Sequence, residues 1–137
     1  MTNNKNEGQG VLIIEDDTFF AEILEKNLIK KGFRVARTPD LPHARMLLEK
    51  ESFSIICFDI IVSGNEGFKK VSELTTDEHL KNTPILLLVD KELEADLTQN
   101  DVIGAFHYIV KSEASNEEIV EKIINLSMGT SKRATTK

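Results

Sequence analysis

The stretch 54-SIICFD-59 decides the fold of this 137-residue chain. Its apolar run is typical of a strand buried on both faces of a parallel sheet, and the run ends at a carboxylate, Asp59. A stretch with the composition of a loop, 63-SGNEG-67, follows soon after. Open α/β sheets place their ligands just outside the carboxyl ends of the strands. We therefore expect Asp59 at a binding or reacting position.

Four other short apolar runs accompany this strand, and segments with helical spacing alternate with them. The predicted strands are residues 11–14, 33–36, 54–58, 85–89 and 106–110. The alternation predicts a parallel sheet with helices on both faces. Right-handed crossovers then limit the topology to a doubly wound, five-stranded, flavodoxin-like (βα)5 fold.

The expected helices carry their own boundary signals. Asp17 or Thr18 can cap the first helix, and 30-KKG-32 is a good C-terminal stop. The second helix starts around 39-PDLP-42, and the third contains residues 68–74 and is broken at 82-NTP-84. A short polar fourth helix is expected over residues 93–100, and Ser115 or Asn116 caps the fifth.

The length and composition indicate one globular domain. With 40% apolar and 29% charged residues, the chain is long enough for one core and too short for two ordinary domains. We expect a disordered lead-in over residues 1–9, a domain over 10–127 and a disordered tail over 128–137. The single cysteine, Cys57, excludes an intrachain disulfide, and we interpret it as a buried residue rather than a nucleophile.

The charge distribution argues against nucleic-acid and membrane partners. The net charge is −6, and without the three basic residues of the last eleven the remainder carries −9. An acidic surface disfavours direct contact with nucleic-acid phosphates. No apolar run approaches the ~18 residues of a membrane span, and the polar start lacks the apolar region of a signal peptide. The cytoplasm is the expected location.

Charged side chains follow several of the predicted strands and would meet at one edge of the sheet. They are Glu15 and Asp16 after the first strand, Asp59 after the third and Lys111 after the fifth. Carboxylates placed together repel unless they are protonated or share a cation, and oxygen-only ligands suit Mg²⁺. The set is a candidate phosphoryl-transfer site, in which Asp59 is the nucleophile and the Lys111 ammonium neutralises phosphoryl oxygens.

At this point the chain resembles the receiver domains of bacterial two-component response regulators over about residues 10–127. The resemblance is carried by 11-VLIIEDD-17, by Asp59 with Gly67 eight positions later, by 84-PILLLV-89, and by Gly104-Ala105 leading to Tyr108 and Lys111. The spacing is specific because each matching residue must end a different strand.

The resemblance implies a role for each matching residue. Glu15 and Asp16 would bind Mg²⁺, with the backbone carbonyl of Ile61 as a further ligand. Asp59 would accept phosphate from a histidine kinase, and Lys111 would contact the phosphoryl group. Tyr108 corresponds to the aromatic residue that changes rotamer on activation.

Three positions depart from the family pattern. The usual Thr or Ser at the end of the fourth strand is Val89, the usual proline after the lysine is Ser112, and the usual methionine–proline pair is Val62-Ser63. A lost hydrogen bond to a charged group is worth ~1.5–3 kcal/mol. We therefore expect that Asp59 can be phosphorylated, while its coupling to the switch residues Val89 and Tyr108 is weaker or differently routed.

The expected function is that of a stand-alone receiver, a phosphoacceptor with at most self-catalysed phosphoryl transfer and autodephosphorylation rather than an enzyme. It would take the phosphoryl group from a histidine kinase or phosphotransfer protein in a phosphorelay. It would signal to an unidentified downstream protein through the face made by the fourth helix, fifth strand and fifth helix. Apolar residues in the fifth helix exceed one core-facing stripe, so part is expected to be exposed (Ile119, Val120, Ile123 and Ile124).

Rival interpretations remain open beside this one. A pseudo-receiver that acts as a binding module without phosphorylation is favoured by Val89 and the missing prolines. A hydrolase with an aspartyl nucleophile would need a second aspartate at Ile61, and a flavin site would need a Ser/Thr/Gly loop after the first strand.

Several polar residues have simpler interpretations. Asp17 is better explained as a helix cap, and Asp90 as the start of the next loop rather than a residue that tunes Mg²⁺ affinity. His43, His79 and His107 share no ligand spacing, so we interpret them as surface or helix-end residues and not as metal ligands.

Overall fold

The computed structural model describes residues 9–60, 64–99 and 106–129. Within these residues the sheet is fully parallel and has the strand order β2-β1-β3-β4-β5. The strands are β1 (Gly10–Ile14), β2 (Arg34–Thr38), β3 (Ile55–Asp59), β4 (Ile85–Val89) and β5 (His107–Val110). The helices are α1 (Thr18–Lys30), α2 (Leu41–Leu48), α3 (Gly64–Leu74), α4 (Lys91–Gln99) and α5 (Asn116–Ser127), with a short 3-10 turn, η2 (Lys111–Glu113). The predicted doubly wound, flavodoxin-like fold is confirmed.

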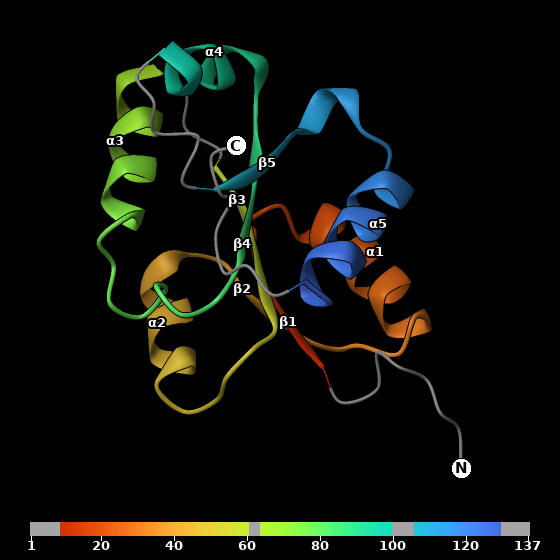
Figure 1. The fold of residues 1–137 in the computed structure, drawn as a ribbon. Coiled ribbons are helices and arrows are strands. Elements are labelled where there is room, and N and C mark those ends of the chain that lie inside the picture. Colours follow the sequence, from red (N-terminus) through yellow and green to blue (C-terminus); the bar gives the residue numbers. More distant parts are fainter. Residues whose placement is uncertain (1–8, 61–63, 100–105, 130–137) are drawn as a thin grey trace.

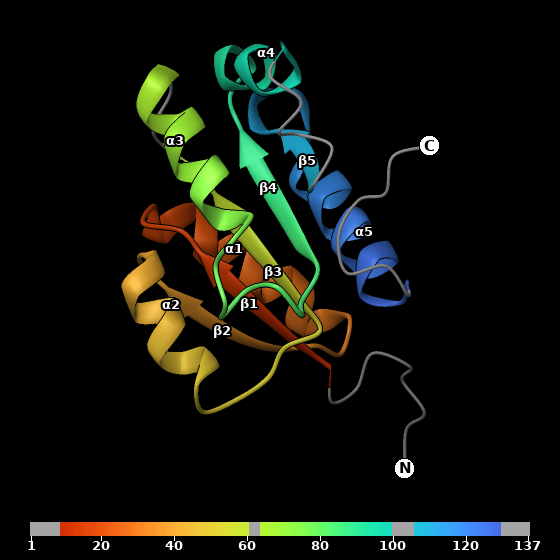
Figure 2. The same ribbon diagram turned by 60° about the vertical axis from the view of Figure 1, so that its left-hand side comes forward.

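The helices form one layer on each face of the sheet (Figures 1 and 2). Helices α1 and α5 pack over one face, and their buried side chains share a core cluster with Val11, Ile13 and Cys57. Helices α2, α3 and α4 cover the other face around a cluster that contains Leu12 and Ile14. Successive residues of a strand point to opposite faces, so a continuous apolar run feeds both cores at once.

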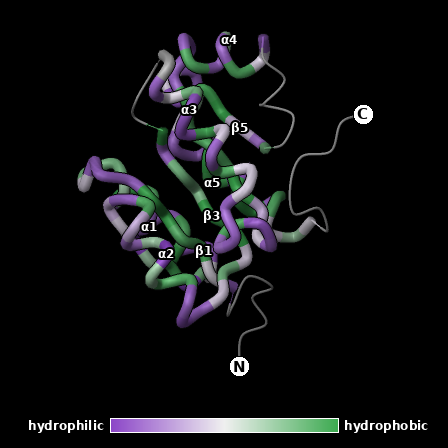
Figure 3. Tube along the Cα trace, turned by 90° about the vertical axis from the view of Figure 1, so that its left-hand side faces the viewer, coloured by the Kyte–Doolittle hydropathy of each residue, from purple (hydrophilic) through white to green (hydrophobic). Residues whose placement is uncertain are grey.

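Burial explains which strands were easiest to predict. Every residue of β1, β3 and β4 is buried, whereas the edge strands β2 and β5 are partly exposed. Figure 3 shows β3 as a hydrophobic stretch, while the helical coils alternate between hydrophobic and hydrophilic residues. The observed strands lie within two residues of the predicted ranges at either end, and β4 matches its range in full.

The predicted helix signals act where they were expected. The Asp17 carboxylate accepts a hydrogen bond from the Phe20 backbone N–H at 3.1 Å, so Asp17 caps α1. Gly32 takes a positive φ of 97° directly after α1, a conformation that glycine adopts without strain. Ser115 and Glu118 form a capping box at the start of α5.

The structure corrects several sequence expectations. Helix α3 ends at Leu74, well before the break expected at residues 82–84. Asp90 lies between β4 and α4, as expected for the start of a loop, and its carboxylate also accepts a hydrogen bond from the Leu93 N–H at 2.7 Å, as a helix cap does. His107 lies on β5, half-buried, rather than on the surface or at a helix end.

The apolar residues of α5 are also more buried than expected. Ile119, Val120 and Ile123 are at most 3% exposed, and Ile124 is half-buried against the same core. These side chains complete the core under α5, so the predicted excess of exposed apolar surface is wrong.

Several expectations lie outside the described residues. They are the two terminal segments apart from residues 9, 128 and 129, Val62-Ser63, the Ile61 carbonyl, and Gly104-Ala105. Among the helices that are described, none is long and apolar enough to cross a membrane.

Candidate functional site

Three strand ends place the charged site residues at one edge of the sheet. Asp59 is the last residue of β3, Glu15 comes directly after β1, and Lys111 comes directly after β5. The parallel register pairs Ile14 with Phe58 and Val89 with Val110, so the strands end nearly level. Side chains far apart in the sequence therefore reach the same place.

Backbone hydrogen bonds hold the chain where it leaves two of these strands. The Glu15 N–H donates to the Thr38 carbonyl at 3.0 Å, which extends the pairing of β1 with β2 by one residue. The Ile60 N–H donates to the Leu88 carbonyl at 2.9 Å, which does the same for β3 and β4. The site carboxylates thus project from backbone that is fixed by the sheet.

Lys111 connects the two buried carboxylates. Its Nζ donates a hydrogen bond to Asp59 Oδ2 and lies 3.6 Å from Glu15 Oε1. The side chains of Glu15 and Asp59 are only 1% and 4% exposed, whereas that of Lys111 is 30% exposed. One ammonium therefore faces two carboxylates, which leaves excess negative charge in a poorly hydrated place.

The pKa values follow from this arrangement. Burial raises the pKa of Glu15 to about 8, and the neighbouring Asp59 carboxylate acts in the same direction. Burial alone would lower the pKa of Lys111, but the hydrogen bond to Asp59 and the two negative charges outweigh it and raise that pKa. Burial also raises the pKa of Cys57, so this thiol stays protonated and unreactive beside the site.

The oxygen atoms at the site fit a hard divalent cation. Glu15 Oε1 is buried and makes no hydrogen bond to the residues that the structure describes, while Glu15 Oε2 accepts one from the Asp17 N–H at 3.2 Å. An unpartnered carboxylate oxygen beside a second carboxylate is a donor set that Mg²⁺ prefers. Asp16 is exposed, and no group of three or more His, Cys, Asp or Glu side chains within the described ranges is already gathered as a metal site.

A hollow of about 330 Å³ gives access to Asp59. It is lined by Asp59, Ile60, Val89, Asp90, Lys111 and Ser112. Val89, which is 1% exposed, thus lies in the wall beside the phosphoacceptor candidate, and it offers no hydroxyl there.

The second predicted switch residue, Tyr108, forms a hydrogen bond with a residue of α4. It is half-buried against the core under α2, α3 and α4, and its hydroxyl donates to Glu94 Oε2 at 2.6 Å. The hydrogen bond to this carboxylate raises the pKa of Tyr108, and burial and the charge of Glu94 add to the effect. Among the described residues, the hydrogen bond of Tyr108 goes to Glu94 and that of Lys111 goes to Asp59, so the two groups are not joined by a hydrogen bond.

The sequence analysis missed three residues that contact this edge of the sheet. Lys111 Nζ lies 4.1 Å from the centroid of the Phe20 ring, and Lys91 forms an ion pair with Glu113 across the rim. Apolar spacing can place Phe20 on the inner face of α1, but spacing alone does not show which side chain the ring meets. Lys91 and Glu113 carry no sequence signal that distinguishes them from ordinary surface charges.

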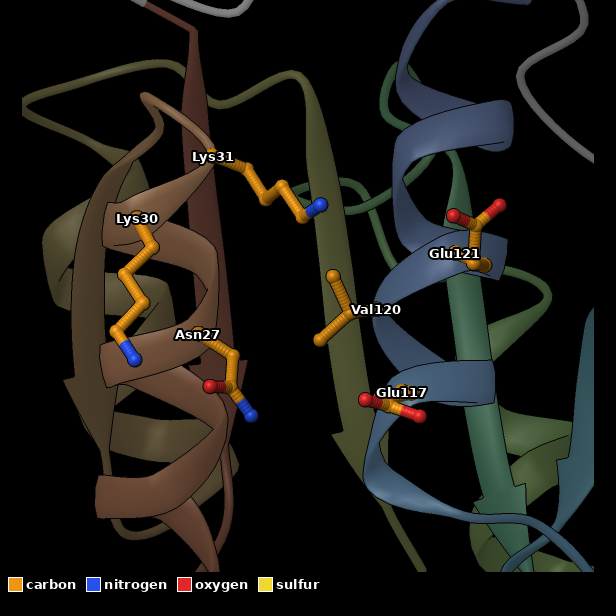
Figure 4. A pocket seen from close by; sticks show the side chains of 6 residues that line it. All are labelled: Asn27, Lys30, Lys31, Glu117, Val120 and Glu121. Atoms are coloured by element: carbon orange, nitrogen blue, oxygen red, sulfur yellow. The ribbon is translucent and has the colours of Figure 1, made fainter.

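A larger hollow, about 450 Å³, lies between α1 and α5. Figure 4 shows the Lys31 side chain, directly after α1, extending toward α5, which carries Glu117, Val120 and Glu121. Its lining residues, which also include Asn27, are shared with neither the Asp59 hollow nor the charged cluster. The larger hollow thus contains none of the candidate site residues, whereas several of them line the smaller one.

Comparison with known proteins gives consistent matches. The family model described as the response regulator receiver domain matches residues 11–124. The chain is 34% identical over 101 residues to protein PetR of Rhodobacter capsulatus, covering 74% of this chain and 41% of PetR. It is 29% identical over 117 residues to the uncharacterized transcriptional regulatory protein YrkP of Bacillus subtilis, covering 83% of this chain and 47% of YrkP. The chain thus spans less than half the length of these two relatives.

A solved structure shows the same fold. The receiver domain of the sensor histidine kinase PA1611 from Pseudomonas aeruginosa, with a magnesium ion coordinated in its active site cleft, superposes with a TM-score of 0.67 at 20% identity. The alignment covers 89% of this chain and 99% of that domain.

Proposed function

The chain belongs to the response regulator receiver domain family, and from this premise we propose that Asp59 accepts a phosphoryl group in a Mg²⁺-dependent step. The donor is a phosphohistidine on a histidine kinase or phosphotransfer protein. The phosphorylated domain then signals to a downstream protein by direct contact.

The hydrogen bond between Lys111 Nζ and Asp59 Oδ2 in the buried cluster carries this proposal. The Asp59 carboxylate attacks phosphorus of a phosphohistidine that is protonated on its other ring nitrogen. A P–O bond forms, and the P–N bond of the donor breaks with its electron pair going to the ring nitrogen. The ammonium of Lys111 stays beside the carboxylate and neutralises charge on a phosphoryl oxygen. The neutral imidazole is the leaving group, so no further reactant is needed.

Mg²⁺ would be held by Glu15 and Asp59, with Asp16 and the Ile61 carbonyl as the remaining candidate ligands. The buried Glu15 Oε1, which makes no hydrogen bond within the described part of the chain, supports this assignment. When bound, the ion supplies positive charge that neutralises phosphoryl oxygens. The magnesium ion in the cleft of the PA1611 receiver domain also supports it.

The downstream protein is proposed to dock on the face formed by α4, β5 and α5. Tyr108 lies on this face and is tied to α4 through Glu94, so a movement of α4 reaches the tyrosine directly. The apolar side chains of α5 are buried in the core, so recognition on this face would depend mainly on polar contacts.

A specific observation favours a second function, that of a binding module that works without phosphorylation. Val89 lines the Asp59 hollow without a hydroxyl, and Tyr108 already has a strong partner in Glu94. In this alternative the face around Tyr108 binds its partner whether or not Asp59 is phosphorylated. The Asp59 cluster then has no role in phosphoryl transfer.

Phosphorylation by a small donor decides between the two functions. The protein is incubated with acetyl phosphate and Mg²⁺, and its intact mass is recorded beside that of Asp59→Asn and a metal-free sample. We expect one phosphoryl adduct on the wild type and none on either control. Asp59→Asn keeps the size of the side chain, and circular dichroism checks that it is folded. Absence of the adduct together with absence of Mg²⁺ binding by titration would establish the binding module instead.

A further inference from the structure

The ammonium of Lys111 has a third neighbour besides the two carboxylates. Its Nζ lies 4.1 Å from the centroid of the Phe20 ring, within the ~6 Å over which a cation is attracted to an aromatic face. The lysine side chain is 30% exposed, so the contact is partly removed from water, which strengthens it. The ring and the Asp59 carboxylate together confine the ammonium.

The helix cap of α1 and packing against the core fix the position of the Phe20 ring. Its own backbone N–H donates to the Asp17 carboxylate that caps the helix. Its side chain is half-buried against the core beneath α1 and α5. A ring held at a capped helix start has little freedom to move when the lysine does.

The ring differs from the two carboxylates in what happens to it during phosphoryl transfer. Asp59 becomes an acyl phosphate, and Glu15 is a proposed ligand of a divalent cation, so the interaction of each with Lys111 changes during the reaction. The negative face of an aromatic ring does not change with the state of the site. Phe20 is therefore the neighbour of Lys111 whose attraction persists through the reaction.

We propose that Phe20 is a positioning residue for phosphoryl transfer, which holds the Lys111 ammonium over the phosphoacceptor through a cation–π contact. The inference rests on the proposed phosphorylation of Asp59. Phe20 does not touch the reacting atoms; it acts by restricting the lysine that does.

The neighbouring Phe19 provides a matched control. It is 73% exposed and lies on the same turn of α1, so Phe19→Leu makes the same chemical change away from the lysine. Phe20→Leu and Phe20→Met remove the aromatic face but keep an apolar side chain of similar size, and Phe20→Tyr keeps the ring. All variants are made in the full chain, and thermal unfolding identifies any that fail to fold.

The first measurement is the rate of phosphorylation by acetyl phosphate at saturating Mg²⁺. We expect Phe20→Leu and Phe20→Met to be slower than the wild type by about two- to thirtyfold, the range of a cation–π contact. Phe20→Tyr restores most of the rate, and Phe19→Leu matches the wild type. Wild-type rates in both Phe20→Leu and Phe20→Met, or a Phe20→Tyr variant as slow as they are, would overturn the proposal.

The second measurement does not depend on phosphorylation. The ε-methylene proton resonances of Lys111 are expected upfield in the wild type and Phe20→Tyr because of the ring current, and at ordinary positions in Phe20→Leu. Ordinary positions in the wild type would refute the contact itself. If the ring-current shift is present but no protein accepts a phosphoryl group, the proposed function fails and the positioning role fails with it, while the contact stands.

Discussion

Strand β5 carries Tyr108 and leads into Lys111 of the Asp59 cluster, but the two regions differ in how their polar groups are satisfied. In the cluster, one lysine faces two buried carboxylates, and Glu15 Oε1 has no hydrogen-bond partner among the residues that are described. In the Tyr108 region the phenol already donates to Glu94, and Val89, in the wall of the Asp59 hollow, is apolar. The Asp59 cluster therefore keeps a carboxylate oxygen that a cation could bind, whereas the Tyr108 hydroxyl already has its hydrogen-bond partner.

This difference bears on two separate questions, whether Asp59 is phosphorylated and whether phosphorylation changes Tyr108. A phosphoryl group shifts a conformational equilibrium only as far as it interacts more strongly with one state than with the other. A hydroxyl at position 89 could make such a state-dependent bond, whereas valine cannot. The structure therefore supports phosphorylation of Asp59 with a weak effect on Tyr108, and the following three predictions test each side of this comparison.

The largest effect is expected from Lys111→Met, which removes the cation from the cluster. Loss of a charge-assisted hydrogen bond of about 3 kcal/mol lowers the phosphorylation rate roughly a hundredfold. The rate is measured with acetyl phosphate and Mg²⁺ by intact mass. Lys26→Met makes the same change of charge on the exposed face of α1 and is expected to keep the wild-type rate. Equal rates in the two variants would show that Lys111 does not take part.

An intermediate effect is expected from Val89→Thr, which restores a hydroxyl in the wall of the hollow. A bond to a phosphoryl oxygen, worth ~1.5–3 kcal/mol, would shift the active-to-inactive ratio roughly ten- to hundredfold if it is felt in full. Tyr108 is the single tyrosine and the chain has no tryptophan, so tyrosine fluorescence reports on this residue alone.

We expect a larger phosphorylation-dependent fluorescence change in Val89→Thr than in the wild type. Val35→Thr makes the same substitution on the edge strand β2 and is expected to leave the response as it is. An unchanged response in phosphorylated Val89→Thr would mean that the missing hydroxyl does not limit coupling.

The smallest effect is expected from Glu94→Gln, which removes the carboxylate that accepts the Tyr108 hydrogen bond. This hydrogen bond is the main cause of the raised pKa of Tyr108, so the pKa falls toward its ordinary value. The phenolate appears at lower pH in an absorbance titration of the single tyrosine. Glu92→Gln on the exposed face of α4 serves as the control. A titration curve that does not move would show that Glu94 does not hold the phenol in solution.

The fold could be predicted because most of its strands are encoded locally. Strands buried on both faces require continuous apolar runs, and 85-ILLLV-89 was therefore delimited in full. The edge strand β2 was predicted less well, because its exposed and polar residues leave no such run. Arg37 and Thr38 are strand residues only because they pair with Ile13 and Ile14.

The meeting of Glu15, Asp59 and Lys111 could also be predicted, since parallel strands that end level bring their last side chains together. The half-buried position of His107 could not be predicted in this way. Strand β5 places this histidine half-buried, its Nε2 has no hydrogen-bond partner among the described residues, and burial lowers its pKa. Nothing in its local sequence distinguished it from a surface histidine.

The sequence by itself determined the order of strands and helices, the helix caps and the edge of the sheet where the charges gather. These follow from periodicity, from short-range hydrogen bonds and from the handedness of the crossovers, all of which are local or nearly so. Only the tertiary structure decided that Phe20 lies against Lys111 and that Glu94 holds Tyr108. Such contacts depend on how a helix sits on the sheet and on which rotamer each side chain adopts, and packing of the whole core sets both.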